Sequence, residues 1–173
     1  ANPGVRLRSH KHIPAFVVRS VKLRRPGMVL IRAPADAAVS WSIYSQTPLA
    51  ETLAYYVDYY RVILPYRGHL FFAPFEAVTG DFGGVIEEFN ARWGTSYARF
   101  THTPENVAAC WGTIEAARLE ADGMIDEAQV PRPSMHRQPR REALLNELNE
   151  SPALRDELLR AEEIYRELAP GEE

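Results

Sequence analysis

An arginine and a serine eight positions apart are the residues of this chain best placed to bind an anion. Arg32 follows Met28–Ile31, a short apolar run that predicts a strand buried on both faces. Pro34 suits the first turn of a helix, and Ser40 comes on that helix. Open α/β sheets bind ligands at the carboxyl ends of their strands, and a guanidinium and a hydroxyl near a helix N-terminus suit a phosphate. The pattern predicts a phosphate site; the alternative is a solvated or ion-paired Arg32.

Length and charge limit the classes of function. The 173 residues give room for one domain with a sizeable core. The net charge of −3 provides no global basic field, so nucleic acid is not an expected partner. The charge is uneven, because residues 1–32 hold eight Lys and Arg and no Asp or Glu, whereas residues 142–173 are rich in Glu. A basic N-terminal segment suits an anionic small ligand, and equally a solvated surface.

The single cysteine and the hydropathy pattern bear on the compartment. Cys110 alone cannot form an internal disulfide, which favours a reducing compartment. No signal peptide is visible, and no apolar run reaches the length of a membrane span. We therefore expect a cytoplasmic protein without a membrane span. No pattern in the sequence indicates the oligomeric state.

Candidate strands alternate with candidate helices along the chain. This alternation predicts an α/β fold with a mainly parallel sheet flanked by helices. We divide the chain into an α/β domain over residues 1–128, a Pro/Arg-rich loop over 129–141, and a helical segment of the same domain over 142–173. The expected strands are 5–9, 28–31, 68–75 and 97–101, and the expected helices are 14–23, 34–44, 48–64, 81–93, 103–122 and 152–168.

Four segments, taken in order, resemble the sulfotransferases that use 3′-phosphoadenosine 5′-phosphosulfate (PAPS). Residues 32–40 (R-A-P-A-D-A-A-V-S) are similar to their R-D-P-R-D-x-x-x-S element, which binds the 3′-phosphate of the nucleotide. Residues 8–10 (R-S-H) resemble their K-T-H element, and residues 72–76 (F-A-P-F-E) resemble their R-Y-E-D segment. The helix over 81–93 then follows as it does in family members. The resemblance covers roughly residues 5–101, with several spaced elements in the right order.

The resemblance implies a P-loop nucleotide-hydrolase-like sulfotransferase fold that is incomplete at its N-terminus. Members of that family begin with a strand and a glycine- and serine-rich loop that binds the 5′-phosphosulfate. Residues 1–26 contain no such loop. The first residue is Ala1 instead of methionine, so we expect either a chain truncated upstream or a protein that has lost this half of the site.

The resemblance further implies that a sulfuryl group passes from PAPS to a hydroxyl or amine acceptor without a metal. His10 would be the catalytic base and Arg8 would offset the charge that develops on the transferred group. Arg32 and Ser40 would hold the 3′-phosphate and orient the nucleotide. Two alternatives remain open at the first segment: His12 is the base, or His10 and His12 together ligate a metal.

A basic stretch late in the chain offers further phosphate contacts. The glycine-rich closing loop of the family has no counterpart here, and arginines stand in its place: Arg132, Arg137, Arg140 and Arg141. We assign Arg137 and Arg140 to nucleotide binding, with a solvated basic linker as the alternative.

Departures from the family pattern keep a second function open. Ala33 replaces the aspartate that commonly follows the arginine, and Arg8 replaces a lysine. The alternative is a non-catalytic relative that keeps the fold as a binding or interaction protein. For an enzyme, we expect a small-molecule, sugar or lipid-like acceptor, since Trp41 and Tyr44 suit either a sugar or a lipid.

Overall fold

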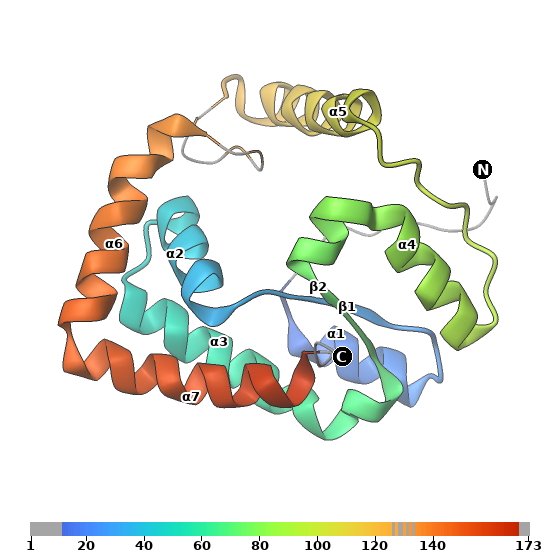
Figure 1. The fold of residues 1–173 in the computed structure, drawn as a ribbon, viewed down its shortest axis with the longest axis horizontal. Coiled ribbons are helices and arrows are strands. Elements are labelled where there is room, and N and C mark those ends of the chain that lie inside the picture. Colours follow the sequence, from blue (N-terminus) through green and yellow to red (C-terminus); the bar gives the residue numbers. More distant parts are fainter. Residues whose placement is uncertain (1–11, 126, 128–129, 131, 133, 170–173) are drawn as a thin grey trace.

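The computed structural model describes residues 12–169 apart from 126, 128–129, 131 and 133 (Figure 1). Helices dominate these residues, and each begins close to a proline or a capping residue visible in the sequence. In chain order the elements are α1 (Pro14–Lys22), β1 (Met28–Ile31), α2 (Pro34–Ser45), α3 (Leu49–Ile63), η1 (Leu64–His69), β2 (Phe71–Pro74), α4 (Phe75–Trp93), α5 (Pro104–Asp122), η2 (Met135–Arg137), α6 (Gln138–Glu150) and α7 (Pro152–Leu168).

The prediction of a mainly parallel sheet flanked by helices is wrong. In the described residues the sheet consists of β1 and β2, which pair in parallel with Val29 opposite Phe72. Residues 97–101 form no strand, and the side chain of Asn90 instead binds the backbone N–H and C=O of Tyr97. The predicted strand over 5–9 lies outside the described residues. The described chain is a mainly helical fold and lacks the P-loop-type sheet that the resemblance implied.

The strand β1 is buried on one face only, contrary to the prediction for its apolar run. Val29 and Ile31 are buried, whereas Met28 and Leu30 are 38% and 43% exposed. This alternation is the pattern of a strand that covers a core on one side. The two parallel strands nevertheless bring their carboxyl ends together, and Arg32 follows β1 there.

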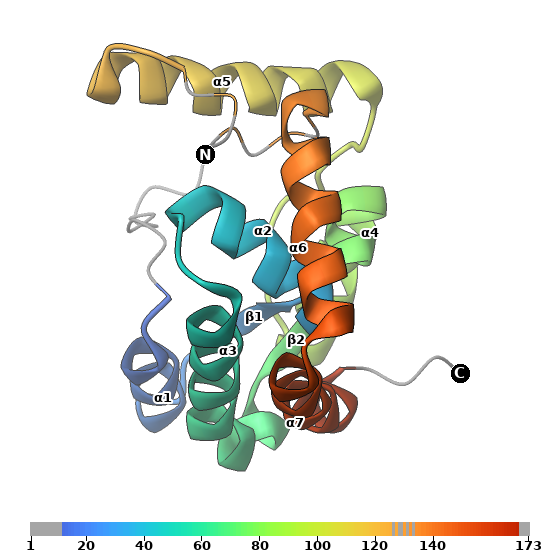
Figure 2. The same ribbon diagram turned by 90° about the vertical axis from the view of Figure 1, so that its left-hand side faces the viewer.

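Helix α3 is the centre of the core. It packs between α1 and α7, as Figure 2 shows, and α2 also contacts it. Large side chains recur at helical spacing along this helix and form a core stripe. Its buried members are Leu49, Leu53, Tyr56, Val57, Tyr60 and Ile63.

Two of these tyrosines attach α3 to β1. The Tyr60 hydroxyl donates a hydrogen bond of 3.0 Å to the carbonyl of Leu30, and the Tyr56 hydroxyl donates one of 2.9 Å to the carbonyl of Arg32. Burial raises the pKa of both phenols well above the ordinary value, so both stay protonated as donors. The backbone at Arg32 is therefore held from the core side.

Helix α4 contains a break at the start of the helix predicted over 81–93. Asp81 has a non-helical backbone (φ −147°, ψ 80°), and its carboxylate accepts a hydrogen bond of 3.1 Å from the N–H of Gly84. Asp81 therefore caps the helical turns that follow it, but helical turns from Phe75 precede it. Strand β2 consequently runs directly into α4, and Phe75 is placed at the end of the strand pair.

Gly83 lets the segment after α4 cross that helix closely. A Cβ at this position would overlap the backbone carbonyl oxygen of Phe100. We expect Gly83→Ala to lower the free energy of unfolding by about 1–3 kcal/mol, because the backbone must shift. Gly112→Ala is the matched control: nothing lies within 4 Å of a Cβ there, and alanine favours helix, so stability rises by about 0.5–1 kcal/mol. Urea denaturation measures both, and equal stability of Gly83→Ala and the parent would contradict the close approach.

Candidate phosphate-binding site

Arg32 stands at the end of β1 with part of its guanidinium unsatisfied. Its Cζ lies 4.2 Å from the centroid of the Phe75 ring, so the guanidinium stacks on the first residue of α4. Its Nε is buried and has no hydrogen-bond partner in the described part of the chain. Buried guanidinium N–H groups in folded proteins have partners in the great majority of cases. This donor therefore suits an anion bound at the end of the strand pair.

Ser40 is the serine of α2 whose hydroxyl is not tied to the backbone. The hydroxyls of Ser42 and Ser45 donate to backbone carbonyls, whereas no hydrogen bond of the Ser40 hydroxyl exists within the described residues. Ser40 lies one turn after Asp36 and one turn before Ile43 on the helix. Since Asp36 pairs with α6 and Ile43 lines a cavity beside α6, Ser40 lies on the α6 side of α2.

Carboxylates neutralise two of the four arginines in the late basic stretch. Arg132 places Nε 2.6 Å from Glu115 of α5 and a terminal nitrogen 2.8 Å from Glu127. A terminal nitrogen of Arg141 in α6 lies 2.6 Å from a carboxylate oxygen of Asp36 in α2. These two side chains connect elements and have their charge compensated.

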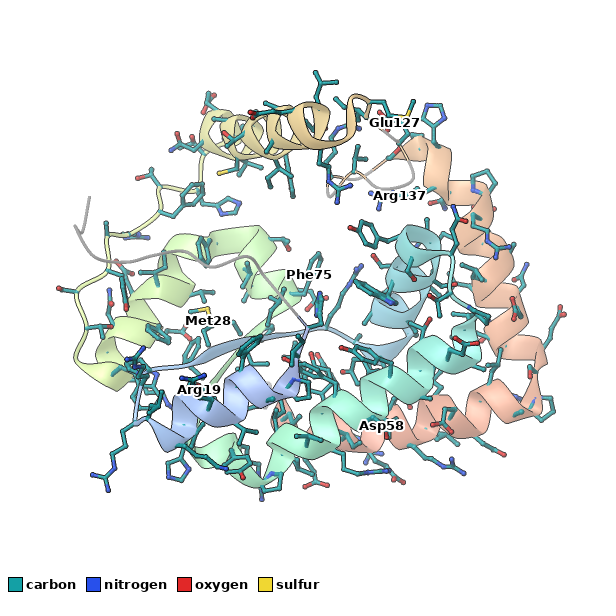
Figure 3. All side chains as sticks on the ribbon, turned by 180° about the vertical axis from the view of Figure 1, so that it is seen from behind. Arg19, Met28, Asp58, Phe75, Glu127 and Arg137 are labelled. Atoms are coloured by element: carbon teal, nitrogen blue, oxygen red, sulfur yellow. The ribbon has the colours of Figure 1, made fainter. Side chains whose placement is uncertain are left out.

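Arg137 and Arg140 form no ion pair among the described residues. The Arg137 guanidinium donates to the backbone carbonyl of Arg132, and Figure 3 shows Arg137 near Glu127 at the start of α6. Burial lowers the pKa of Arg137; Glu127 acts in the opposite direction, and the charges of Arg132 and Arg32 lower it further.

A cavity with a basic lining lies between α2 and the start of α6. Its volume is about 380 Å³, and none of its described lining residues is acidic. A helix N-terminus carries a partial positive charge, so uncompensated cations at the start of α6 are unfavourable without a counter-anion. The lining residues are Ser42, Ile43, Gln46, His136, Arg137 and Arg140.

The predicted catalytic residues His10 and Arg8 lie outside the described residues. The alternative base, His12, is described: its ring meets that of Trp41 of α2 edge to face, with centroids 5.1 Å apart. His12 is therefore beside the helix that carries Ser40. No set of three or more His, Cys, Asp or Glu side chains in the described ranges is arranged to hold a metal ion. Nor does any helix in those ranges have the length and apolarity to cross a bilayer.

Sequence reasoning missed Phe75 and Tyr56 as supports of Arg32. Both belong to patterns that the sequence displays, the F-A-P-F-E segment and the tyrosine stripe of α3. The contact of the Phe75 ring with the Arg32 guanidinium depends on how α4 packs against β1. The hydrogen bond from the Tyr56 hydroxyl to the Arg32 carbonyl likewise depends on how α3 packs against β1.

The network around Arg132 gives a pH prediction. Hydrogen bonds from Ser134 and then Arg132 hold the pKa of the Glu127 carboxyl below its ordinary value. The resulting stabilisation is complete above the ordinary carboxyl pKa of about 4.3 and is lost as the pH falls through the lowered value. We expect protection of the Arg132 terminal N–H group that donates to Glu127 to decrease as the pH falls through the lowered pKa of this carboxyl. Glu127→Gln should lack this pH-dependent loss of protection. Glu157 forms an ion pair with Arg160, and the control variant Glu157→Gln should keep the loss of protection at Arg132.

Comparison of the chain with protein-family models, with curated proteins and with solved structures gives no match in any of the three. The residues of the site and their contacts therefore carry the functional argument.

Proposed function

We propose that this chain binds PAPS through the 3′-phosphate of the nucleotide and takes part in sulfuryl transfer from that donor to a hydroxyl or amine acceptor. The observation that carries the proposal is Arg32, whose buried Nε has no partner in the described residues while its guanidinium is held on Phe75. The resemblance of residues 32–40 to a 3′-phosphate element supports the choice of nucleotide.

The residues present fit a phosphate group. Arg32 offers a planar fork of donors that suits two phosphate oxygens, and Ser40 offers a hydroxyl that nothing else in the described chain engages. Arg137 and Arg140 add positive charge that no carboxylate among the described residues pairs with. Bound PAPS supplies the sulfuryl group, while these four residues bind the nucleotide and fix its position.

Calorimetric titration with adenosine 3′,5′-bisphosphate, the desulfated product of PAPS, tests the proposal. We expect saturable binding of this compound and at least about tenfold weaker binding of adenosine 5′-monophosphate, which lacks the phosphate that Arg32 holds. The ligand should also raise the melting temperature of the protein. Equal affinity for the two nucleotides would contradict a 3′-phosphate site, and absence of binding at millimolar concentration would contradict a nucleotide site.

A non-catalytic binding protein is the second candidate. It is favoured by a departure from the family pattern inside the candidate phosphate element, where Ala33 stands in place of the aspartate that commonly follows the arginine. Such a protein would bind adenosine 3′,5′-bisphosphate through the same arginines but would not convert PAPS into it. Incubation of the chain with PAPS and a panel of hydroxyl and amine acceptors separates the two candidates.

For the enzyme, we expect His10→Ala to abolish sulfuryl transfer and to leave the affinity for adenosine 3′,5′-bisphosphate unchanged. The reason is that a general base takes the proton of the acceptor and does not hold the nucleotide. His12→Ala is the matched variant, and its transfer rate should fall by much less. Transfer that survives in His10→Ala and disappears in His12→Ala would reassign the base to His12.

A further inference from the structure

The outward face of α1 carries large apolar side chains between cations. Val17, Val18 and Val21 pack against the core, and the opposite side of the helix carries Phe16, Arg19 and Leu23 at spacings of three and four residues. Phe16 is 55% exposed and Leu23 is 51% exposed. Helix α1 therefore has one apolar face inside the fold and a second one, interrupted by charge, outside it.

Helix α3 extends this surface. It packs against α1, and the Tyr55 hydroxyl donates a hydrogen bond to the backbone carbonyl of His12, directly before α1. Val62 lies two turns after Tyr55 on the same side of α3. We call the combined patch the α1–α3 surface; its apolar members, each 42–55% exposed, are Ile13, Phe16, Leu23, Tyr55 and Val62.

Cations surround the α1–α3 surface and exceed the carboxylates beside it. None of these cations forms an ion pair among the described residues. Figure 3 shows the face that bears Arg19 on α1 and Asp58 on α3. The cations are Arg19, Lys22, Arg24, Arg25 and Arg61, and the carboxylates on this side of α3 are Glu51 and Asp58.

We propose that the α1–α3 surface binds an anionic lipid bilayer peripherally. Phe16 and Leu23 enter the boundary between headgroups and acyl chains, and the cations flanking them contact anionic headgroups. A nucleic-acid phosphate backbone binds cations and offers no apolar surface to a cluster of half-exposed apolar side chains. Such a cluster lowers its free energy by leaving water only where the partner is itself apolar. The nine-residue α1 lies along the surface of the fold, where it can lie flat on a bilayer (Figure 2). This proposal is independent of the phosphate site.

Flotation with lipid vesicles tests the proposal on the full chain. At about 0.1 M salt we expect binding to vesicles of phosphatidylcholine with about 30% phosphatidylserine, little binding to pure phosphatidylcholine, and release as salt rises. Phe16→Ser with Leu23→Ser, and separately Arg19→Glu with Lys22→Glu, should each lower the partition coefficient by about tenfold or more. Leu159→Ser with Arg155→Glu, on exposed positions of α7, is the matched control and should bind as the parent does.

Three results would overturn the proposal. The first is equal flotation of the parent with both vesicle types, and the second is undiminished flotation of the two α1 variants. The third is that the parent does not float and instead binds DNA or self-associates, and that the α1 variants lose this binding or self-association. Circular dichroism and melting temperature confirm that each variant is folded. Arg32→Ala should float as the parent does, so failure of the phosphate site and failure of the α1–α3 surface are distinguishable.

Discussion

Arg32→Ala should weaken the binding of adenosine 3′,5′-bisphosphate by about a hundredfold or more, as measured by calorimetry. Hydrogen bonds to a charged group contribute about 1.5–3 kcal/mol each, and a guanidinium fork makes two of them with one phosphate. The variant should remain folded, because the Arg32 side chain forms no ion pair in the described residues and the backbone carbonyl keeps its hydrogen bond from Tyr56.

Two controls make this result specific. Arg32→Lys keeps the charge but not the fork, so we expect an intermediate affinity. Arg155→Ala removes an exposed arginine of α7 and should leave the affinity unchanged. If Arg32→Ala bound the nucleotide as tightly as the parent, Arg32 would not be a phosphate ligand.

Leu53→Ala should have the largest effect on stability. Leu53 is fully buried in α3, the helix that contacts α1, α2 and α7, so its truncation leaves a cavity where these elements meet. We expect the free energy of unfolding to fall by about 2–5 kcal/mol.

Urea denaturation with Leu159→Ala as control checks this expectation. Leu159 is 56% exposed on α7, and its truncation should change stability by no more than about 0.5 kcal/mol. Similar losses in the two variants would mean that α3 is not the centre of the core.

The helices other than α6, whose first residues lie in the predicted loop over 129–141, could be predicted from the sequence because their end signals are local. Pro34 begins α2, Thr103 accepts a hydrogen bond from the Asn106 N–H at the start of α5, and Gly123 follows that helix in a left-handed conformation. Sheet pairing is not local. A short segment such as 97–101 (Y-A-R-F-T) resembles a strand whether or not a partner strand lies beside it, and here the Asn90 side chain binds the backbone of Tyr97.

The site shows the same division between local and distant information. The place of Arg32 after a strand was predicted correctly, because an apolar run and Pro34 define the end of β1. The sequence contains no sign that Arg141 is ion-paired, since its partner Asp36 lies 105 positions away. Only the folded chain shows which guanidinium groups are already paired with carboxylates.

NMR of the arginine Nε–H groups during titration with adenosine 3′,5′-bisphosphate tests most directly whether Arg32 binds the 3′-phosphate. We expect the Arg32 resonance, assigned by its absence from Arg32→Lys, to move downfield and saturate with the calorimetric affinity. Adenosine 5′-monophosphate should leave that resonance in place. A saturating titration that moves other arginine resonances while that of Arg32 stays fixed would contradict the proposed phosphate site.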